Sequence, residues 1–264
     1  MKKLIVILVF LSLSAGLLLM LPAALSAPDE REQPFLILRV WNADEEPAVH
    51  SWLRSQAKAF ERETGRRVYL RAVSGDTLDA AGTALPPDAL IRPDGEWLLA
   101  LRGYALILRD ENASVTPAPT GALFFRPSLT PDPTAVPLPW PEENELRAVL
   151  CPEALMNVLP GAISSVHPAA DLTQGKADAA VLTPGQAAGL SMGWRAYAIP
   201  EGKGFLPVRA TAYSGEGEAF LAWLRGDAAQ QALGQAGLFS PRLRLYSSDD
   251  PVRHLIENSL FTEN

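Results

Sequence analysis

Residues 35–73 constrain the fold more than any other part of the sequence. Phe35–Trp41 (FLILRVW) is a short, almost continuously apolar run, which is typical of a strand buried in a parallel sheet. Between Pro47 and Gly65, apolar residues recur near helical spacing, and proline suits the first turn of a helix. Arg67–Val73 (RVYLRAV) alternates as a second strand. Strand, helix and strand in this order form a βαβ unit, which predicts a parallel sheet.

The alternation of strands and helices continues along the chain. Short apolar runs predict strands at residues 89–91, 104–108, 179–182, 194–199 and 206–213. Helices are predicted at about residues 77–83, 96–101, 216–233 and 251–261. The apolar face of the last helix would consist of Val252, Leu255, Ile256 and Leu260. Pro152 is expected to divide residues 143–158 into two pieces. The pattern therefore indicates an α/β fold.

A proline-rich stretch interrupts this pattern from Ala113 to Pro160. Ten of the 23 prolines fall within these 48 residues, so long regular helices or strands are not expected there. Residues 123–125 and Trp140 are nevertheless apolar enough to pack against a core. We expect ordered, irregular crossings between two lobes, and a disordered linker is the alternative interpretation.

The N-terminus has the pattern of an export signal. Two lysines precede an uncharged apolar run, Leu4–Leu21, and Ala24 and Ser26 are small residues suited to a cleavage site. We therefore expect residues 1–26 to direct export. Because the run of 18 residues nearly spans a bilayer, an uncleaved signal anchor is the alternative. In both cases the remaining chain faces outward, at the extracellular face of the cytoplasmic membrane or in the periplasm.

Composition and charge exclude several classes of protein. With 48% hydrophobic and 20% charged residues, the chain can bury a core, which argues against wholesale disorder. The net charge of −7 becomes −9 from Ala27 onward, and this acidic balance argues against a nucleic-acid-binding protein. A single cysteine cannot form an internal disulfide, a cysteine zinc site or an iron–sulfur cluster. We expect Cys151 to be a small core residue, and its position excludes a lipid anchor near the N-terminus.

Three segments carry a resemblance to a known family. Leu38–Val73 contains AFERETG, Asp171–Ala187 contains GKADAAV, and Glu216–Phe239 contains AQQALGQAGLF. In this order and spacing they resemble the extracellular solute-binding proteins of ABC importers, which have similar AF-x-x-x-T-G, G-x-A-D-A-x-V and late helical motifs. The length of the exported part is similar to that of compact members, of which the molybdate-binding proteins are an example.

The resemblance implies an α/β, two-lobed periplasmic-binding-protein-like fold (type II), in which each lobe is a parallel or mixed sheet flanked by helices. Residues 34–110 and 205–264 would form the first lobe, and residues 111–204 a smaller second lobe that includes the proline-rich crossing. It also implies a monomer without a cofactor. Such a protein captures a small ligand in the cleft between its lobes and docks onto a membrane permease, without covalent chemistry.

Candidate ligand-binding residues follow from a rule of α/β folds, in which ligands sit beyond the carboxyl ends of the strands. The residues at these positions are Trp41, Asn42, Asp44, Ser74, Asp76, Arg92, Asp94, Thr183 and Tyr213. Aromatic, amide and carboxylate groups together suit a sugar or a cationic ligand. The alternative is a structural role, since Asp44 can cap a helix and the segments around Asp76 and Asp94 can form ordinary turns.

The charge after the first predicted strand narrows the class of ligand. Anion-binding members of the family have small hydroxyl residues there, where a helix N-terminus can hold an oxyanion. Here the loop contains Asp44, Glu45 and Glu46, which would repel molybdate, sulfate or phosphate. We therefore expect a sugar, an amine, a peptide or a metal ion as the ligand, rather than an oxyanion.

Signals of catalysis are scarce in the sequence. His50, His167 and His254 lie far apart without a metal-binding pair, and neither a G-x-S-x-G motif nor a P-loop occurs. Cys151 lacks the context of a nucleophile. We therefore expect a binding protein and not an enzyme. Two alternatives stay open: a membrane-anchored sensor or accessory protein with the same fold and no transport role, and an exported hydrolase with an unrecognised site.

Overall fold

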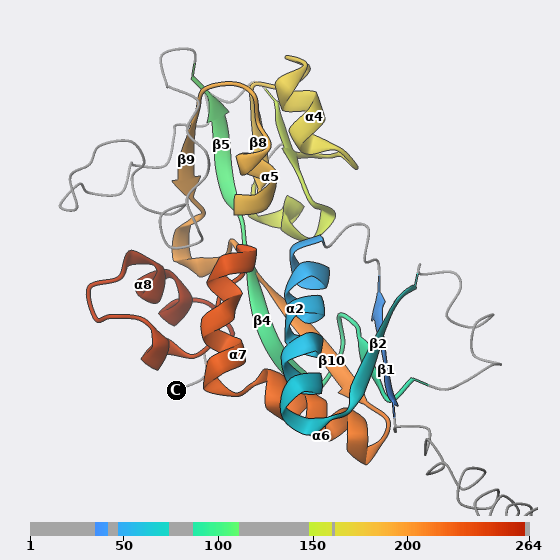
Figure 1. Cartoon of the computed structure of the whole chain (residues 1–264). Coiled ribbons are helices and arrows are strands. Elements are labelled where there is room, and N and C mark those ends of the chain that lie inside the picture. Colours follow the sequence, from blue (N-terminus) through green and yellow to red (C-terminus); the bar gives the residue numbers. More distant parts are fainter. Residues whose placement is uncertain (1–34, 42–46, 74–86, 111–147, 160–161, 262–264) are drawn as a thin grey trace, which may run out of the picture.

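Two sheets of five strands each form the framework of the protein (Figure 1). The computed structural model describes residues 35–41, 47–73, 87–110, 148–159 and 162–261. The first sheet has the strand order β2 (Arg67–Val73), β1 (Phe35–Trp41), β3 (Ala89–Ile91), β10 (Phe205–Ala212) and β4 (Trp97–Gly103). The second sheet has the strand order β7 (Ala162–Ser164), β6 (Val149–Cys151), β8 (Ala179–Leu182), β5 (Ala105–Arg109) and β9 (Trp194–Ala198).

The predicted βαβ unit forms one side of the first sheet. β1 and β2 pair in parallel along their whole length, and β3 lies parallel to β1 on its other side. The connection between β1 and β2 contains α2 (Pro47–Thr64), whose apolar face packs against the sheet and against α6 (Gly215–Leu224). Phe60 and Phe220 meet edge to face between the two helices, with ring centroids 5.0 Å apart. The prediction of a parallel βαβ unit is confirmed.

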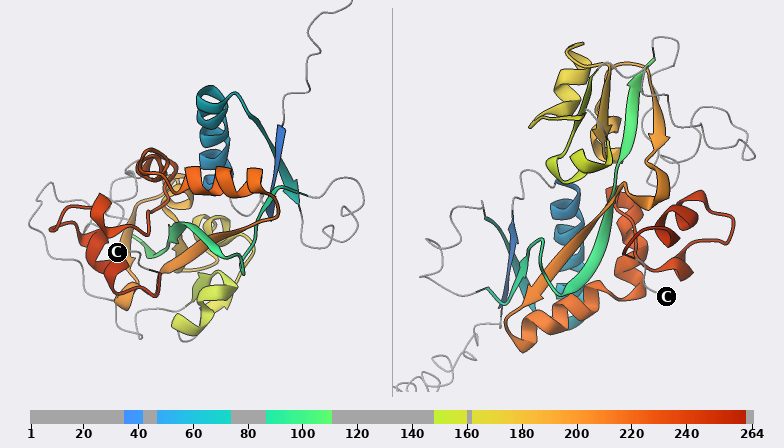
Figure 2. Two further views of the ribbon diagram at one scale, coloured as in Figure 1. Left: turned by 90° about the horizontal axis from the view of Figure 1, so that it is seen from below. Right: turned by 180° about the vertical axis from the view of Figure 1, so that it is seen from behind.

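Two connections carry the chain between the sheets (Figure 2). β4 leads through Tyr104 directly into β5, and β9 returns through η5 (Pro200–Gly202) to β10. Each sheet combines parallel and antiparallel pairs. The second lobe also carries η4 (Glu153–Val158), α4 (Pro168–Thr173) and α5 (Pro184–Ala188). The predicted α/β class with two lobes is confirmed, because each lobe of the described chain contains one mixed sheet with helices beside it.

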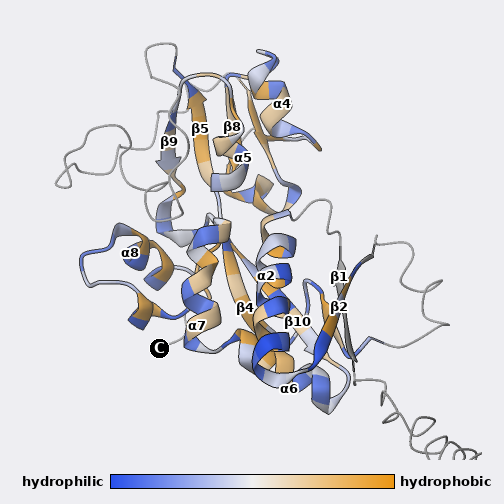
Figure 3. Cartoon of the chain, viewed as in Figure 1, coloured by the Kyte–Doolittle hydropathy of each residue, from blue (hydrophilic) through white to orange (hydrophobic). Residues whose placement is uncertain are grey.

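One hydrophobic cluster contains residues from both lobes. In Figure 3, the strands β4, β5 and β8 are coloured largely as hydrophobic. One cluster fills the space between the first sheet and the helices α2 and α6. A second cluster combines Leu101, Phe205 and Phe239 with residues on one face of the second sheet. The third cluster lies on the opposite face of the second sheet and contains Cys151, which is buried as predicted.

The segment predicted as a helix at residues 96–101 is a strand. Trp97–Gly103 forms β4, which pairs with the antiparallel β10 and is fully buried from Leu99 to Leu101. Leucine and alanine favour a helix when they are considered alone, and this local preference produced the wrong prediction. Because β4 is covered on both faces, its sequence lacks the alternation that marks a half-buried strand.

The helix predicted at residues 216–233 consists of three pieces. They are α6, α7 (Asp227–Gln231) and the short η6 (Ala232–Ala236). The continuous helix is interrupted at Gly226, whose backbone is extended (φ −64°, ψ 153°) and precedes the first turn of α7. Gly237 ends η6 in the left-handed conformation, with φ 75°, which glycine adopts without steric cost.

The last helix, α8 (Pro251–Glu257), is shorter than the predicted 251–261. Val252 and Ile256 are buried as expected, but Leu260 is 94% exposed and does not belong to the apolar face. The Ser259 N–H and hydroxyl both donate to the carbonyl oxygen of Ile256, at 2.9 and 2.8 Å, so the chain turns before Leu260. Local hydrogen bonding of this kind competes with continuation of the helix.

Pro152 divides the stretch before residue 158 as predicted, because β6 ends just before it and η4 begins just after it. Three other predictions lie outside the described residues. They concern the signal segment 1–26, the short helix at 77–83, and the proline-rich crossing between residues 113 and 147.

Gln230 joins three parts of the first lobe. Its amide nitrogen donates to the carbonyl oxygens of Leu99 in β4 (2.8 Å) and Leu224 in α6 (3.0 Å), and its amide oxygen accepts from the Ser240 hydroxyl (2.6 Å). The side chain is 3% exposed, so all of these bonds form away from water. A buried amide with three partners stabilises the arrangement of the elements that it joins.

Replacement of Gln230 by alanine should lower the free energy of unfolding by about 1–3 kcal/mol, because two buried carbonyl groups lose their donor. Chemical denaturation measures the difference. The neighbouring Gln231 is exposed, so Gln231→Ala is the matched control and should change stability little. Equal losses in the two variants would contradict the structural role of Gln230.

Candidate functional site

The carboxyl ends of the parallel strands in the first sheet point toward the second lobe. β10 begins in the first sheet at Phe205, directly after the connection from β9, and runs away from the second lobe. Its Ala210 lies opposite Ile91 and its Ala212 opposite Ala89, so β3 ends nearer to the connection than it begins. β1 and β2 are parallel to β3, and their carboxyl ends therefore point the same way.

The second sheet repeats this geometry from the other side. β5 leaves the connection at Ala105, which lies opposite Leu182 at the end of β8. β6 and β7 run parallel to β8, so the carboxyl ends of all three point back toward the first lobe. We call the two facing edges the interlobe face, defined by the strand ends Trp41, Val73, Ile91, Cys151, Ser164 and Leu182. Ligands of α/β proteins bind beyond such edges, which makes the interlobe face the candidate site.

The pairing of the strands brings the predicted positions of the first lobe to one edge. Trp41 ends β1, and its backbone lies opposite Val73 at the end of β2. Val40 lies opposite Ile91, so Arg92 begins the loop that leaves the sheet at the same level. The predictions for Asn42, Asp44, Ser74 and Asp76 lie outside the described residues.

Arg92, Asp94 and Tyr213 form a connected polar cluster. The two carboxylate oxygens of Asp94 accept hydrogen bonds from Nε and Nη2 of Arg92, each at 2.5 Å. The Tyr213 hydroxyl oxygen lies 3.3 Å from Nη1 of Arg92 and accepts a third bond. The hydrogen bond between Arg92 and Asp94 is the main cause that raises the pKa of Arg92 and lowers the pKa of Asp94. The positive charge of Arg92 is therefore balanced within the cluster.

The backbone of Tyr213 lies at the opposite edge of the sheet from the interlobe face. Because β10 is antiparallel to β3, Tyr213 follows Ala212 at the level where β3 begins, and its N–H donates to the carbonyl oxygen of Asp88 at 2.8 Å. The sequence analysis placed Tyr213 correctly at the end of its own strand. It could not tell that this strand runs in the opposite direction. Only the side chain reaches Arg92.

Thr183 lies at the interlobe face of the second lobe, where it caps α5. Its hydroxyl oxygen accepts from the Gln186 N–H at 3.4 Å, and the Gln186 side-chain oxygen accepts from the Thr183 N–H at 2.9 Å. The next two residues lie close to the first lobe, because a Cβ atom added to Gly237 would lie 3.6 Å from Pro184 and 3.8 Å from Gly185. The cap therefore fixes the start of α5 next to the first lobe.

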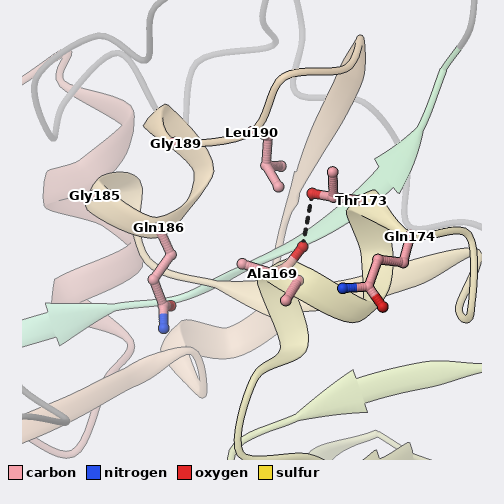
Figure 4. A pocket seen from close by; sticks show the side chains of 8 residues that line it. Ala169, Thr173, Gln174, Gly185, Gln186, Gly189 and Leu190 are labelled. Atoms are coloured by element: carbon pink, nitrogen blue, oxygen red, sulfur yellow. Dashed lines mark hydrogen bonds between the residues drawn. The ribbon is translucent and has the colours of Figure 1, made fainter.

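A pocket of about 460 Å³ opens between α4 and α5 in the second lobe (Figure 4). Gln174 extends from the end of α4 and Gln186 from α5, while the Thr173 hydroxyl donates to the Ala169 carbonyl oxygen within α4 at 2.9 Å. The small side chains of the two helices leave this space open. The lining residues are Ala169, Ala170, Thr173, Gln174, Gly185, Gln186, Gly189 and Leu190. The sequence analysis predicted none of them as site residues, although four of the eight lie in the segment Asp171–Ala187 quoted for the resemblance.

Other chemistry-bearing groups are dispersed in the described part of the chain. No three histidine, cysteine, aspartate or glutamate side chains of the described residues are grouped as a metal site. The thiol of Cys151 is buried, and burial raises its pKa, which favours the unreactive protonated form. Among the helices of the described residues, none combines the length and the apolar character needed to cross a membrane.

Comparison with solved structures finds proteins of similar fold. No known family matches the sequence, and no curated protein matches it. Peb3 from Campylobacter jejuni covers 78% of this chain and 99% of its own, with 14% identity and a TM-score of 0.48. The spermidine/putrescine ABC transporter substrate-binding protein PotD from Streptococcus pneumoniae covers 88% and 93%, with 10% identity and a TM-score of 0.48.

A third similar structure is an ABC-type phosphate transport receptor from Vibrio cholerae. It covers 78% of this chain and 100% of its own, with 10% identity and a TM-score of 0.46. At these identities the similarity concerns the fold alone. The ligands named for these proteins are theirs, and the interlobe face of this chain must be judged from its own residues.

Removal of the Thr183 cap should lower stability. Thr183→Ala removes the hydroxyl that accepts from the Gln186 N–H and donates to the Gln186 side-chain oxygen, so the free energy of unfolding should fall by about 1 kcal/mol in chemical denaturation. Thr173→Ala is the matched control, because the hydroxyl of Thr173 is exposed and bonds only within its own helix. A larger loss from Thr173→Ala than from Thr183→Ala would contradict the capping role.

The titration of Asp94 tests the polar cluster. The pKa of Asp94 should lie below the ordinary value in the folded protein and return toward it in Arg92→Ala, as followed by NMR of the carboxyl carbon. Because folding lowers this pKa, the interaction favours the folded state above the ordinary aspartate pKa and is lost as the pH falls through the lowered value. Arg195→Ala, which breaks an ion pair with Asp110 elsewhere, is the control and should leave Asp94 unchanged. An unchanged Asp94 titration in Arg92→Ala would show that the cluster does not form.

Proposed function

We propose that this chain is an exported solute-binding protein that captures a small ligand between its lobes and presents it to the membrane permease of an ABC importer. One observation carries the proposal: the carboxyl edges of the parallel strands in both sheets are directed at each other across the connections. A ligand held there contacts both lobes at once. Its binding therefore favours the arrangement in which the lobes close on it. Capture of this kind requires no covalent step.

Ligand contacts in this proposal come from the ends of the strands. In the first lobe they are made by Trp41, Asn42, Asp44, Ser74, Asp76, Arg92 and Asp94. Tyr213 contributes through its bond to Arg92. In the second lobe, Thr183 uses its hydroxyl for the cap of α5, so its part is to position the start of that helix.

The charge of these groups favours a neutral or cationic ligand, such as a sugar, an amine, a peptide or a metal ion. The positive charge of Arg92 is already paired with both carboxylate oxygens of Asp94, which weakens its attraction for an anion. The sequence adds three carboxylates at positions 44–46. Together these features disfavour an oxyanion at the interlobe face.

Export is the second part of the proposal, and residues 1–26 supply the signal for it. Sequencing of the N-terminus of the protein isolated from cells distinguishes the two forms. A mature chain that begins at Ala27 would indicate a released binding protein. Retention of residues 1–26 would favour the membrane-anchored sensor or accessory protein.

A thermal-shift screen of the purified chain tests ligand capture. The screen contains sugars, amines, short peptides, divalent metal ions and oxyanions. A specific ligand at 100 times its Kd should stabilise the folded state by about 2.7 kcal/mol, because it binds the folded form alone. We expect the stabilising compound to be a neutral or cationic one.

Two arginine variants locate the site. Arg92→Ala should weaken the stabilisation by the ligand, whereas Arg195→Ala, which removes a similarly exposed arginine paired with Asp110, should leave it unchanged. Stabilisation by molybdate or phosphate alone would contradict the proposed ligand class. Turnover of an ester, peptide or glycoside by the purified chain would replace the binding function with that of a hydrolase.

A further inference from the structure

The return connection between the lobes has a constrained backbone. Residues 199–204 join β9 to β10, and Glu201 (φ 57°) and Gly202 (φ 65°) in this stretch both adopt the left-handed conformation. Among the described residues, Glu201 is the one non-glycine residue with a positive φ. Such a conformation persists only where the surrounding structure holds it in place.

The end of α8 supplies this support. Gly202 is buried, and a Cβ atom placed on it would lie 2.3 Å from the carbonyl oxygen of Leu255 and 2.7 Å from the nitrogen of Ser259. The backbone of the connection therefore touches the backbone of the C-terminal segment directly. A larger residue at position 202 would have to displace one of the two, because neither contact involves a flexible side chain.

The two connections between the lobes also touch each other. The N–H of Tyr104, between β4 and β5, donates to the carbonyl oxygen of Gly204 at 2.9 Å. A Cβ atom on Gly204 would lie 2.6 Å from the carbonyl oxygen of Tyr104. Gly202 lies against α8, and Gly204, two residues further along the same connection, is hydrogen-bonded to Tyr104 in the other connection. Both connections are therefore linked to α8.

The buried face of α8 belongs to a hydrophobic cluster that contains residues from both lobes. Val252 and Ile256 are 0% exposed, and they belong to the cluster that contains Leu182 of the second sheet. The same cluster contains Phe205 and Phe239, whose rings meet edge to face with centroids 5.4 Å apart. α8 therefore packs where β10 begins and where the second sheet meets the first lobe.

We propose that α8 is a brace on the connections that restricts the angle between the two lobes. A rotation of one lobe against the other requires changes of φ and ψ at a few connecting residues. η5 can change only by moving against α8, whose other side is held in the shared core. The angle of the lobes is therefore coupled to the position of α8. This coupling exists without any ligand, so it stands independently of the proposed function.

Replacement of Gly202 by alanine tests the brace. Spin labels on cysteines at Ala222 in the first lobe and Ala170 in the second lobe report the distance between lobes in the full chain by double electron–electron resonance. Both positions are exposed, while the native Cys151 is buried and will not take the label. Gly202→Ala should broaden the distance distribution and speed the hydrogen exchange of the Tyr104 amide by about tenfold or more.

Gly65→Ala is the matched control. Gly65 has a similar left-handed backbone, with φ 72°, but a Cβ atom there would meet nothing within 4 Å. Both variants therefore share the strain of the conformation, and only Gly202→Ala pushes on α8. If the two variants give the same distance distribution as the parent chain, α8 does not restrict the lobes and the proposal is wrong.

A second pair of variants keeps the test valid if Gly202→Ala does not fold. Ile256→Ala removes buried contacts of α8 and leaves the sequence of the connection unchanged, whereas Leu260→Ala changes a side chain that is 94% exposed. Ile256→Ala should broaden the distance distribution while the near-UV circular dichroism stays that of a folded protein, and Leu260→Ala should not. An unchanged distribution in a folded Ile256→Ala would overturn the brace.

Discussion

The packing of one apolar cluster across the boundary between the lobes is the interaction on which the rest of the structure depends. Leu101, Phe205 and Phe239 from the first lobe share this cluster with α8 and with one face of the second sheet. Burial of apolar surface is the main source of stability in a protein of this size. Here the burial of apolar surface also holds the backbone of the two connections, from β4 to β5 and from β9 to β10, in one conformation. Among the described residues, the two sheets are otherwise joined through the crossings from β4 to β5 and from β9 to β10.

The direction of the strands is the basis for the proposed binding of a ligand between the lobes. The two connections orient the sheets so that the carboxyl ends of the parallel strands in one sheet point toward those of the other sheet. The interlobe face therefore combines loops from different parts of the chain without requiring them to be neighbours in sequence. The cluster of Arg92, Asp94 and Tyr213 shows how such loops are ordered: its charges are paired internally, which leaves no isolated arginine to attract an anion. As the proposed brace, α8 would restrict how far the two lobes can rotate against each other.

Local sequence patterns predicted the parallel βαβ unit, and β3, β5, β8, β9 and β10, because burial and turn residues are periodic along the chain. They failed where tertiary packing opposed local preference. β4 looks helical in isolation, but it is held as a strand by pairing with β10. Gly226 interrupts a helix that its neighbours would continue. For the candidate site, sequence reasoning predicted Arg92 and Asp94 from their position after a strand. It missed the pocket between α4 and α5, because open space between helices leaves no periodic signal.

The sequence by itself determined the alternation of helices and strands and the acidic character of the chain. These properties depend on neighbours along the chain, where spacing and side-chain chemistry act directly. Only the tertiary structure decided that Tyr213 bonds to Arg92 from the far edge of the sheet, that Gly237 lies close to the start of α5, and that Gly202 lies against α8. Each of these contacts joins residues that are distant in sequence. Their formation depends on the path of the two connections, which is set by packing across the lobes.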